Sequence, residues 1–421
     1  MEKTKKARLG GKLRGIRELL GVFGAFALIF VLLSVIPGVS EKFLAPSNLF
    51  NIARQITVNI VLACGLTMAI LIGGIDLSVG SVIAISGCLV GGLMTNNGLP
   101  VYAAIAIGLA SGAVFGAVNG LVISRTNIPP FIVTLATMYV GRGIVRLYTD
   151  SSTILITDDV FSYIGSGKLF GVVPIQIIYI VVLCLVTWFI LNRTKFGRHI
   201  YAVGDNEQAA LFTGINVRRV KLTVYVLVGL FAAIAGILNA ARTSAGLYTS
   251  GEGYEMDAIA AVVLGGTSMT GGVGRLAGSV IGAMIIGVLS NGMNLMGFNS
   301  AWQYVVKGAV LLIAVLIDYF KKKRDRWFAH RRPQSEKSTS RLRHRHGDRR
   351  RHSPGLSAGQ PRVRARGHNH FLRREHKARG DGERPVPRGG QKSPHPRRLR
   401  EAAAHTPDGD DGASGGHTPP L

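Results

Sequence analysis

The sequence predicts an all-α membrane protein with about ten transmembrane helices and with both termini in the cytoplasm. Three observations support this fold class. Of the 421 residues, 48% are hydrophobic and only 17% are charged. Apolar runs long enough to cross about 30 Å of hydrocarbon recur through residues 1–326. Clusters of basic residues are separated by even numbers of these runs, which places the clusters on one side of a membrane.

The distribution of charge divides the chain into a membrane part and a tail. The net charge is +26; residues 1–326 carry 27 basic and 14 acidic side chains, and residues 327–421 carry 22 and 9. The tail also holds 10 of the 11 histidines, and so polar a composition cannot bury enough apolar surface to fold alone. We therefore expect a basic cytoplasmic N-terminus (1–19), a transmembrane domain (20–324) and a basic low-complexity tail (325–421).

The tail mixes Arg, His, Gly, Pro and Ser without helical periodicity or aromatic clusters. A basic tail that binds nucleic acid or anionic lipid would show such patterning. The composition is instead typical of a GC-rich gene translated in the wrong frame. We expect a disordered and dispensable tail, and no nucleic-acid partner.

Ten apolar runs define the expected spans. The eighth is short and interrupted by a Gly-Gly pair, which indicates a discontinuous helix held inside the protein. A similar break, GGIDLSVGS, follows the second run; an internal repeat and a chance match explain this likeness equally well in a chain with 54 glycines. The runs lie near 20–37, 56–73, 79–95, 101–124, 131–149, 171–191, 222–241, 257–270, 275–294 and 301–320.

The basic clusters set the expected orientation. They occupy 3–17, 192–221 and 321–326, with six runs between the first two and four between the second and third. Since Lys and Arg concentrate on the cytoplasmic side, all three clusters are expected there. Acidic segments at 150–159 and 252–255 then fall on the outer face.

Glycine recurs at every fourth position in two runs. Such stripes allow helix backbones to approach closely, and in lipid this packing must supply the attraction between helices. The stripes therefore predict a tight bundle. They are Gly108, Gly112, Gly116 and Gly120 in the fourth run, and Gly274, Gly278 and Gly282 in the ninth.

No motif indicates an enzyme. The phosphate loop GxxxxGK[ST], HExxH and GxSxG are all absent, and His199 is the only histidine before the tail. Cys64, Cys88 and Cys184 lack the spacing of a disulfide framework or a metal site. We expect no bound metal or cofactor; if ATP drives the protein, a partner uses the ATP and its magnesium.

Polar residues within the runs are the candidates for a translocation pathway. Asp76 and Asp318 lie near run ends, where charges are usually interfacial, and no carboxylate is evident in mid-run, which disfavours an ion-coupled carrier. Amides and hydroxyls suit a neutral polyhydroxylated solute because they exchange hydrogen bonds without a large desolvation cost. Hydrogen bonds between helices explain each of them equally well. The candidates are Asn59, Thr67, Asn119, Asn239, Asn291 and Asn294.

The loop at 192–221 is expected to contain a short docking helix. Asp205 can cap this helix, with Gln208 completing a capping box, and Gly214 can end it in a left-handed conformation. A solvated connector lying on anionic lipid is the alternative. The apolar surface at 209–212 favours docking onto a partner protein.

Five segments of the chain form a distinctive series. They are GGIDLSVGS (73–81), NIPPFIVTLATM (127–138), TKFGRHIYAVGDNEQAALFTGINV (194–217), GEGYEMDAIAAVVLGGTSMTGGVG (251–274) and SNGMNLMG (290–297). Each resembles a signature of the permease subunit of bacterial ribose-type ABC sugar importers, the second class of carbohydrate uptake systems. The segments occur in the order typical of that family and cover nearly all of residues 20–324.

The resemblance implies a multi-pass subunit of the bacterial cytoplasmic membrane. It would pair with a second permease copy, as a homodimer or pseudo-dimer, and work with an ABC ATPase and a periplasmic or extracellular sugar-binding protein. The implied activity is import of a monosaccharide, ribose or a related pentose or hexose, by alternating access. An ATP-independent secondary transporter or channel for a small polar solute is the alternative.

The resemblance also implies that the ATPase docks on the loop at 192–221. The loop residues that carry this coupling role are Gly197, Arg198, Gly204, Asp205, Asn206, Glu207, Ala209, Ala210 and Gly214.

Overall fold

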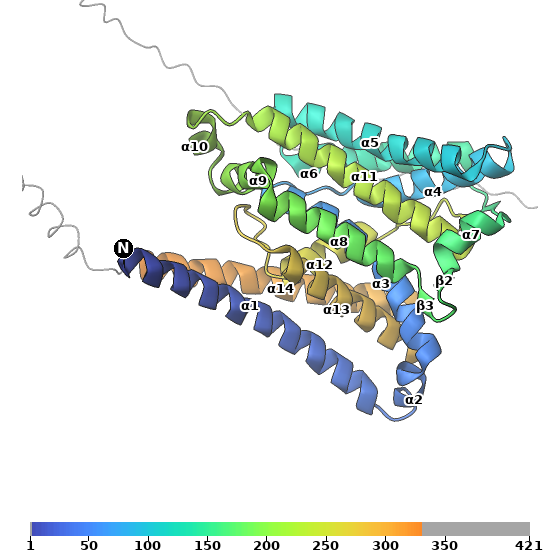
Figure 1. The fold of residues 1–421 in the computed structure, drawn as a ribbon, viewed down its shortest axis with the longest axis horizontal. Coiled ribbons are helices and arrows are strands. Elements are labelled where there is room, and N and C mark those ends of the chain that lie inside the picture. Colours follow the sequence, from blue (N-terminus) through green and yellow to red (C-terminus); the bar gives the residue numbers. More distant parts are fainter. Residues whose placement is uncertain (1, 331–421) are drawn as a thin grey trace, which may run out of the picture. The chain divides into compact units, whose positions relative to one another are not determined.

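The computed structural model describes residues 2–330, which are mostly helical (Figure 1). The first half of this region contains α1 (Glu2–Val35), α2 (Ser40–Leu44), α3 (Pro46–Leu71), α4 (Val79–Thr95), α5 (Val101–Arg125) and α6 (Pro130–Thr149). An irregular segment follows, with β1 (Ile154–Leu155), α7 (Asp159–Ser166), β2 (Lys168–Leu169) and β3 (Val173–Pro174). The second half contains α8 (Gln176–Arg193), α9 (Lys195–Asp205), α10 (Glu207–Phe212), α11 (Val217–Thr243), β4 (Ala245–Gly246), α12 (Tyr254–Leu264), α13 (Leu276–Leu295) and α14 (Ser300–His330).

Seven helices in the described part of the chain are long and apolar enough to cross a membrane: α3, α5, α6, α8, α11, α13 and the segment 300–320 of α14. Leu19–Val35 and Val79–Thr95 are shorter apolar helices. The expected eighth span is the 11-residue helix α12, followed by an irregular loop at 265–275. The helix ends because Gly265 and Gly266 follow Leu264, and Gly266 has a left-handed φ of 87°.

Helix α14 continues past residue 324 to His330, so the predicted tail does not begin where the helix ends. The remainder of the predicted tail, 331–421, lies outside the described residues.

The most buried of the long helices are α3, α11 and α13, and the shorter helix α4 is also largely buried. In the most apolar window of each helix, 89% of the residues of α3, 78% of α11 and 72% of α13 are buried. The corresponding shares are 22% for α5, 17% for α8 and 6% for α14. The outward faces of α5 and α8 are apolar in mid-helix, which suits contact with lipid or with another membrane subunit.

The glycine stripe of α5 lies at the contact with α11. All four of its glycines are buried. A Cβ on Gly112 would lie 2.5 Å from the Cβ of Ala233, and one on Gly116 would lie 2.9 Å from the Cα of Val226. The two helices could not pack this closely if the stripe carried side chains.

The second stripe is only partly helical. Gly278 and Gly282 of α13 pack against the end of α12, where the backbone of Gly265 and that of Ala261 would obstruct a side chain. Gly274 lies before α13 begins, and faces Thr267 across the loop at 265–275. The helical part of the expected stripe therefore begins at Gly278, and Gly274 belongs to the loop.

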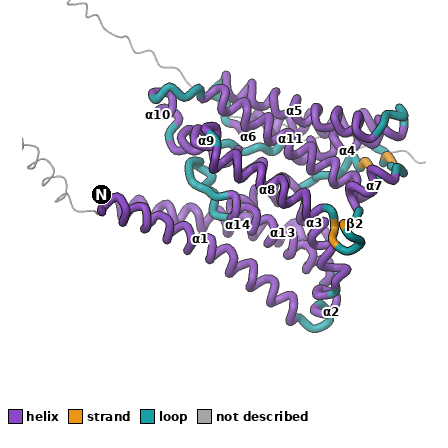
Figure 2. The backbone as a smooth tube through the Cα atoms, in the orientation of Figure 1, coloured by secondary structure: helices purple, strands orange, loops and turns teal. Residues whose placement is uncertain are grey.

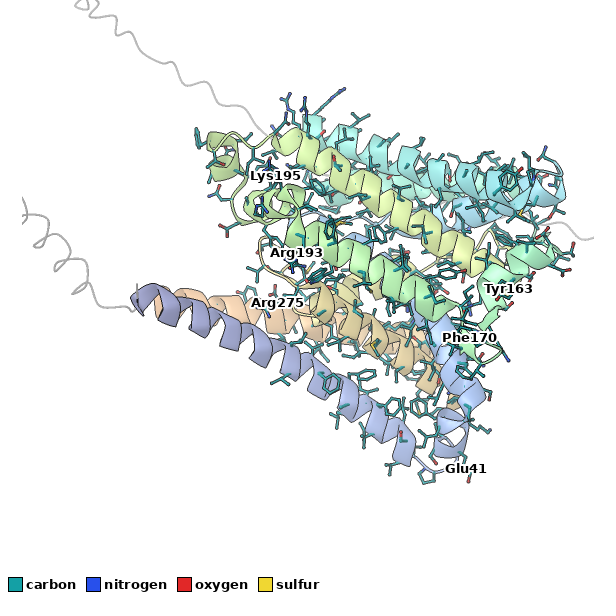
Figure 3. The ribbon with its side chains drawn as sticks, in the orientation of Figure 1. Glu41, Tyr163, Phe170, Arg193, Lys195 and Arg275 are labelled. Atoms are coloured by element: carbon teal, nitrogen blue, oxygen red, sulfur yellow. The ribbon has the colours of Figure 1, made fainter. Side chains whose placement is uncertain are left out.

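The two ends of the bundle differ in structure. Helices α9 and α10 lie at one end, and α2, α7 and the short strands lie at the other (Figures 1 and 2). There, β1 pairs antiparallel with β4, and β2 pairs antiparallel with β3. Figure 3 shows Arg193, Lys195 and Arg275 towards the α9–α10 end, whereas Tyr163 and Phe170 lie towards the opposite end.

Candidate coupling surface and polar sites

The loop at 192–221 folds into two short helices rather than one. Thr194 caps α9 by accepting a hydrogen bond from the amide of Gly197 (3.0 Å), and Asn206 caps α10 by accepting one from the amide of Ala209 (2.9 Å). The expectation that Asp205 caps the helix is wrong, because Asp205 is the last residue of α9. With Asn206 as the cap, the third helical position is Ala209, so Gln208 cannot complete a capping box.

Helix α10 is held by its two ends. Glu207 in its first turn pairs with Lys221 of α11, whose Nζ lies 2.8 Å from Oε1. Gly214 follows the last turn with a left-handed φ of 84°. Between these anchors, Ala210 faces inwards and is buried, while Ala209 is exposed.

The outer side of α10 presents an apolar tip to solvent. Leu211 is 47% exposed and Phe212 is 89% exposed. Arg198 of α9 and Arg218 in the first turn of α11 are also exposed. Two adjacent apolar side chains exposed on a short helix outside the long apolar helices are available for contact with a partner protein.

The inner side of α9 is joined to the bundle through glycine backbones. The amide of Gly272, in the loop at 265–275, donates a hydrogen bond to the carbonyl of Leu71 at the end of α3 (2.9 Å). A Cβ on Gly204 would overlap that same carbonyl and lie 2.6 Å from the amide nitrogen of Gly272. We call this three-way contact of Leu71, Gly204 and Gly272 the glycine junction.

The glycine junction joins the two Gly-Gly breaks that look alike in the sequence. The chain leaves α3 through Gly73 and Gly74, and approaches α13 through Gly271 and Gly272. A Cβ on Gly271 would lie 2.9 Å from the amide nitrogen of Gly73. The end of α9 is therefore in direct backbone contact with the end of α3 and with the loop between α12 and α13.

A buried polar network lies beside the glycine junction. Asp76 is 1% exposed, and its Oδ1 accepts hydrogen bonds from the amide (2.9 Å) and the hydroxyl (2.6 Å) of Ser78. Asn119 of α5 donates to that hydroxyl (2.9 Å) and accepts from Thr137 of α6 (2.7 Å). Burial raises the pKa of the Asp76 carboxyl to about 6. Asp76 lies between the end of α3 and the start of α4, and its carboxyl group is buried in protein rather than solvated.

The first turn of α12 carries two carboxylates that were not among the expected site residues. Asp257 is 6% exposed and forms an ion pair with Lys307 of α14 (2.6 Å). Glu255 lies in the same first turn and is half-buried. Glu255 was missed because the expected run began only at 257, whereas α12 begins at Tyr254. Asp257 is the first residue of that run, a position where a charge is usually interfacial.

The amides proposed for the pathway are mostly engaged in hydrogen bonds between or within helices. Asn239 donates to Ser250 (3.0 Å), Asn291 exchanges hydrogen bonds with Asn48, and Asn294 accepts one from Gln303 (2.7 Å). Asn59 and Thr67 are buried in α3. The structure thus scatters these candidates over several contacts, and Asn239 shares its partner Ser250 with Arg142 of α6.

Residues 48–315 match the family described as the permease component of branched-chain amino acid transport systems. The ribose import permease of Bacillus subtilis is 48% identical over 297 residues, which cover 70% of this chain and 92% of the relative. The chain belongs to the permease family of ribose-type ABC importers. The ribose import permease of Escherichia coli is 44% identical over 301 residues (70% and 92%), and the D-allose transport permease of the same organism is 35% identical over 297 (70% and 91%).

The matching family is a permease component, which is a transport subunit and not an enzyme. The permease is a multi-pass protein of the inner membrane, in agreement with its seven long apolar helices. Its helices α9 and α10, with their exposed tip, lie where a second subunit can reach them (Figure 1).

Proposed function

We propose that this permease imports ribose or a related pentose or hexose by alternating access, driven by a partner ATPase. ATP and magnesium are bound by that partner. A binding protein outside the membrane delivers the sugar, and two permease copies form the pathway. The relatives named for ribose and D-allose support this substrate class.

The topology that fits this function has ten membrane segments, with both termini in the cytoplasm. The seven long helices are supplemented by α1, α4 and the broken segment built from α12 and the loop at 265–275. This count places the basic α9–α10 end in the cytoplasm, where an ATPase is available.

The structure of the α9–α10 unit is the main support for this function. Its exposed tip is an apolar surface to which a partner can bind. The glycine junction connects the α9–α10 unit to α3 and to the loop between α12 and α13. Coupling of ATP hydrolysis to transport requires an element whose position both subunits bias, and the contacts of the α9–α10 unit support this role.

The test compares two phenylalanines at opposite ends of the bundle. Phe212 of α10 is 89% exposed and Phe170, in the turn between β2 and β3, is 90% exposed, so neither contributes much to the permease's own core. We expect Phe212→Ala to abolish co-purification of the ATPase and ATP-driven uptake, because a buried aromatic anchor contributes about 2 kcal/mol or more to an interface. Phe170→Ala should retain both. Equal behaviour of the two variants would refute the docking role of α10.

A further inference from the structure

A cluster of charged and amide side chains lies inside the bundle where α12 begins. Arg142 of α6 donates hydrogen bonds through Nη1 to the carbonyls of Ser250 (2.7 Å) and Tyr248 (3.4 Å). Asn239 of α11 donates to the hydroxyl of Ser250 (3.0 Å) and accepts from Arg242 (3.0 Å). The irregular segment before α12 is thus held from both sides by side chains that can donate or accept hydrogen bonds.

Glu255 completes the cluster with an acceptor that is left unused. Its Oε1 accepts from the amide of Gly253 (3.3 Å), but Oε2 is buried without a hydrogen-bond partner among the described residues. Arg142 and Glu255 attract each other electrostatically. The carboxylate packs against Gly80 of α4, where a Cβ would overlap it. A buried carboxylate oxygen without a donor is costly, so this position favours a ligand that brings one.

The cluster lies well inside the helical bundle. Arg142 precedes the end of α6 at Thr149, and Lys307 follows the start of α14 at Ser300, each by about 10 Å at a rise of about 1.5 Å per residue. Lys307 pairs with Asp257 in the first turn of α12, so α12 begins at a similar depth. Non-helical backbone at such depth is tolerated only where it is buried in protein or lines a watery cavity.

One side of the cluster is open. Arg146 and Glu252 form an ion pair at 4.0 Å, and their side chains are 58% and 48% exposed. The exposed mid-helix face of α8 contrasts with this, because its side chains are apolar, for example Val181 and Leu185. Charged side chains are unfavourable against lipid, so the open side of α6 and α12 faces water or a second subunit.

We propose that Arg142, Asn239, Ser250 and Glu255 form a binding site for a neutral polyhydroxylated solute within the translocation pathway. This inference rests on the proposed function. A vicinal diol donates one hydroxyl to Glu255 Oε2 and accepts from the guanidinium of Arg142. The opposite charges of these two residues balance, so a neutral solute replaces their existing contacts without leaving a net charge unpaired.

The first test measures transport of radiolabelled D-ribose into liposomes that contain the permease, its ATPase and its binding protein. Glu255→Gln should lower ribose uptake about tenfold or more, since loss of a hydrogen bond to a charged group has roughly this effect. Gly80→Ala, which crowds the carboxylate, should act in the same direction. Co-purification of the ATPase should be unchanged in both variants. The matched control is Glu41→Gln in the exposed helix α2, which should transport like the wild type.

The accessibility of introduced cysteines provides a second test of the site that does not depend on the uptake assay. In a variant without Cys64, Cys88 and Cys184, a cysteine at the half-exposed Met256 should react with a water-soluble methanethiosulfonate and be protected by ribose during turnover. A cysteine at Leu185, on the apolar face of α8, should react slowly with and without ribose.

The outcomes distinguish failure of the proposed binding site from failure of the proposed function. Wild-type uptake that depends on the ATPase, together with undiminished uptake by Glu255→Gln, would overturn the site and leave the proposed function intact. Lack of wild-type uptake would count against the proposed function. A cysteine at position 256 that reacts no faster than one at 185 would overturn the site in either case.

Discussion

Replacement of Gly204 by alanine tests whether the α9–α10 unit is mechanically joined to the bundle. The new methyl group would overlap the carbonyl oxygen of Leu71 and come within 2.6 Å of the amide nitrogen of Gly272. Both obstacles are backbone atoms, so they cannot rotate away as a flexible side chain could. Relief of the overlap requires α9 to move away from α3 or the hydrogen bond from Gly272 to Leu71 to break.

The magnitude follows from three contributions. Overpacking costs roughly 1–3 kcal/mol. Loss of the hydrogen bond between Gly272 and Leu71 costs about 1 kcal/mol. Alanine in a helix returns about 1 kcal/mol relative to glycine. The expected net loss in the free energy of unfolding is therefore roughly 1–3 kcal/mol.

Two assays apply to Gly204→Ala: thermal unfolding in detergent and ATP-driven ribose uptake. We expect a lower melting temperature and slower uptake, while the ATPase still co-purifies because Phe212 is untouched. The control is Gly143→Ala in α6, where no atom lies within 4 Å of the added methyl group and a small gain in stability is expected. If Gly204→Ala matched Gly143→Ala in stability and transport, the glycine junction would not be the mechanical connection described here.

Three further substitutions test the polar contacts. Asp76→Asn should stabilise the permease at pH 7.5 by on the order of 3 kcal/mol, because the carboxyl pKa of about 6 lies above its unfolded value. The wild type recovers this stability as the pH falls through 6 towards 4. The difference in melting temperature between Asp76→Asn and the wild type should therefore shrink on acidification, and a difference that grew would contradict the assigned pKa. Lys307→Met should cost about 3 kcal/mol by leaving Asp257 buried without its partner, and the added change Asp257→Leu should restore most of the loss in the same melting assay. Asn206→Ala should cost about 1 kcal/mol through loss of the α10 cap, seen as faster proteolysis of the loop at 192–221, whereas Gln208→Ala should be neutral.

The helical fold could be predicted from the sequence because lipid imposes a strict length and hydrophobicity on each crossing. Helices α5, α6 and α13 correspond to expected runs with similar ends. Helix α3 begins ten residues before its expected run, since Pro46 is compatible with a first helical turn that apolar content alone does not reveal. The break after α12 was predicted because Gly-Gly pairs end helices in a recognisable way.

The candidate sites depended on packing that the sequence does not display. The apolar surface near Phe212 was predicted from residue type. Its attachment to the bundle was not, because Leu71, Gly204 and Gly272 are distant in the chain and interact through backbone atoms. Glu255 was assigned to the outer face, since nothing local shows that the chain enters the bundle before α12. The predicted cap, Asp205, precedes the observed cap, Asn206, by one residue, because Asp and Asn have similar capping preferences.

The most direct test of the account is the dependence of ribose uptake on the ATPase. Liposomes containing the permease would be prepared with and without the partner ATPase, supplied with ribose-loaded binding protein, and assayed with ATP or with an imposed ion gradient. We expect uptake only when the ATPase and ATP are both present, and loss of that uptake in Phe212→Ala. Uptake driven by an ion gradient without the ATPase would contradict the account.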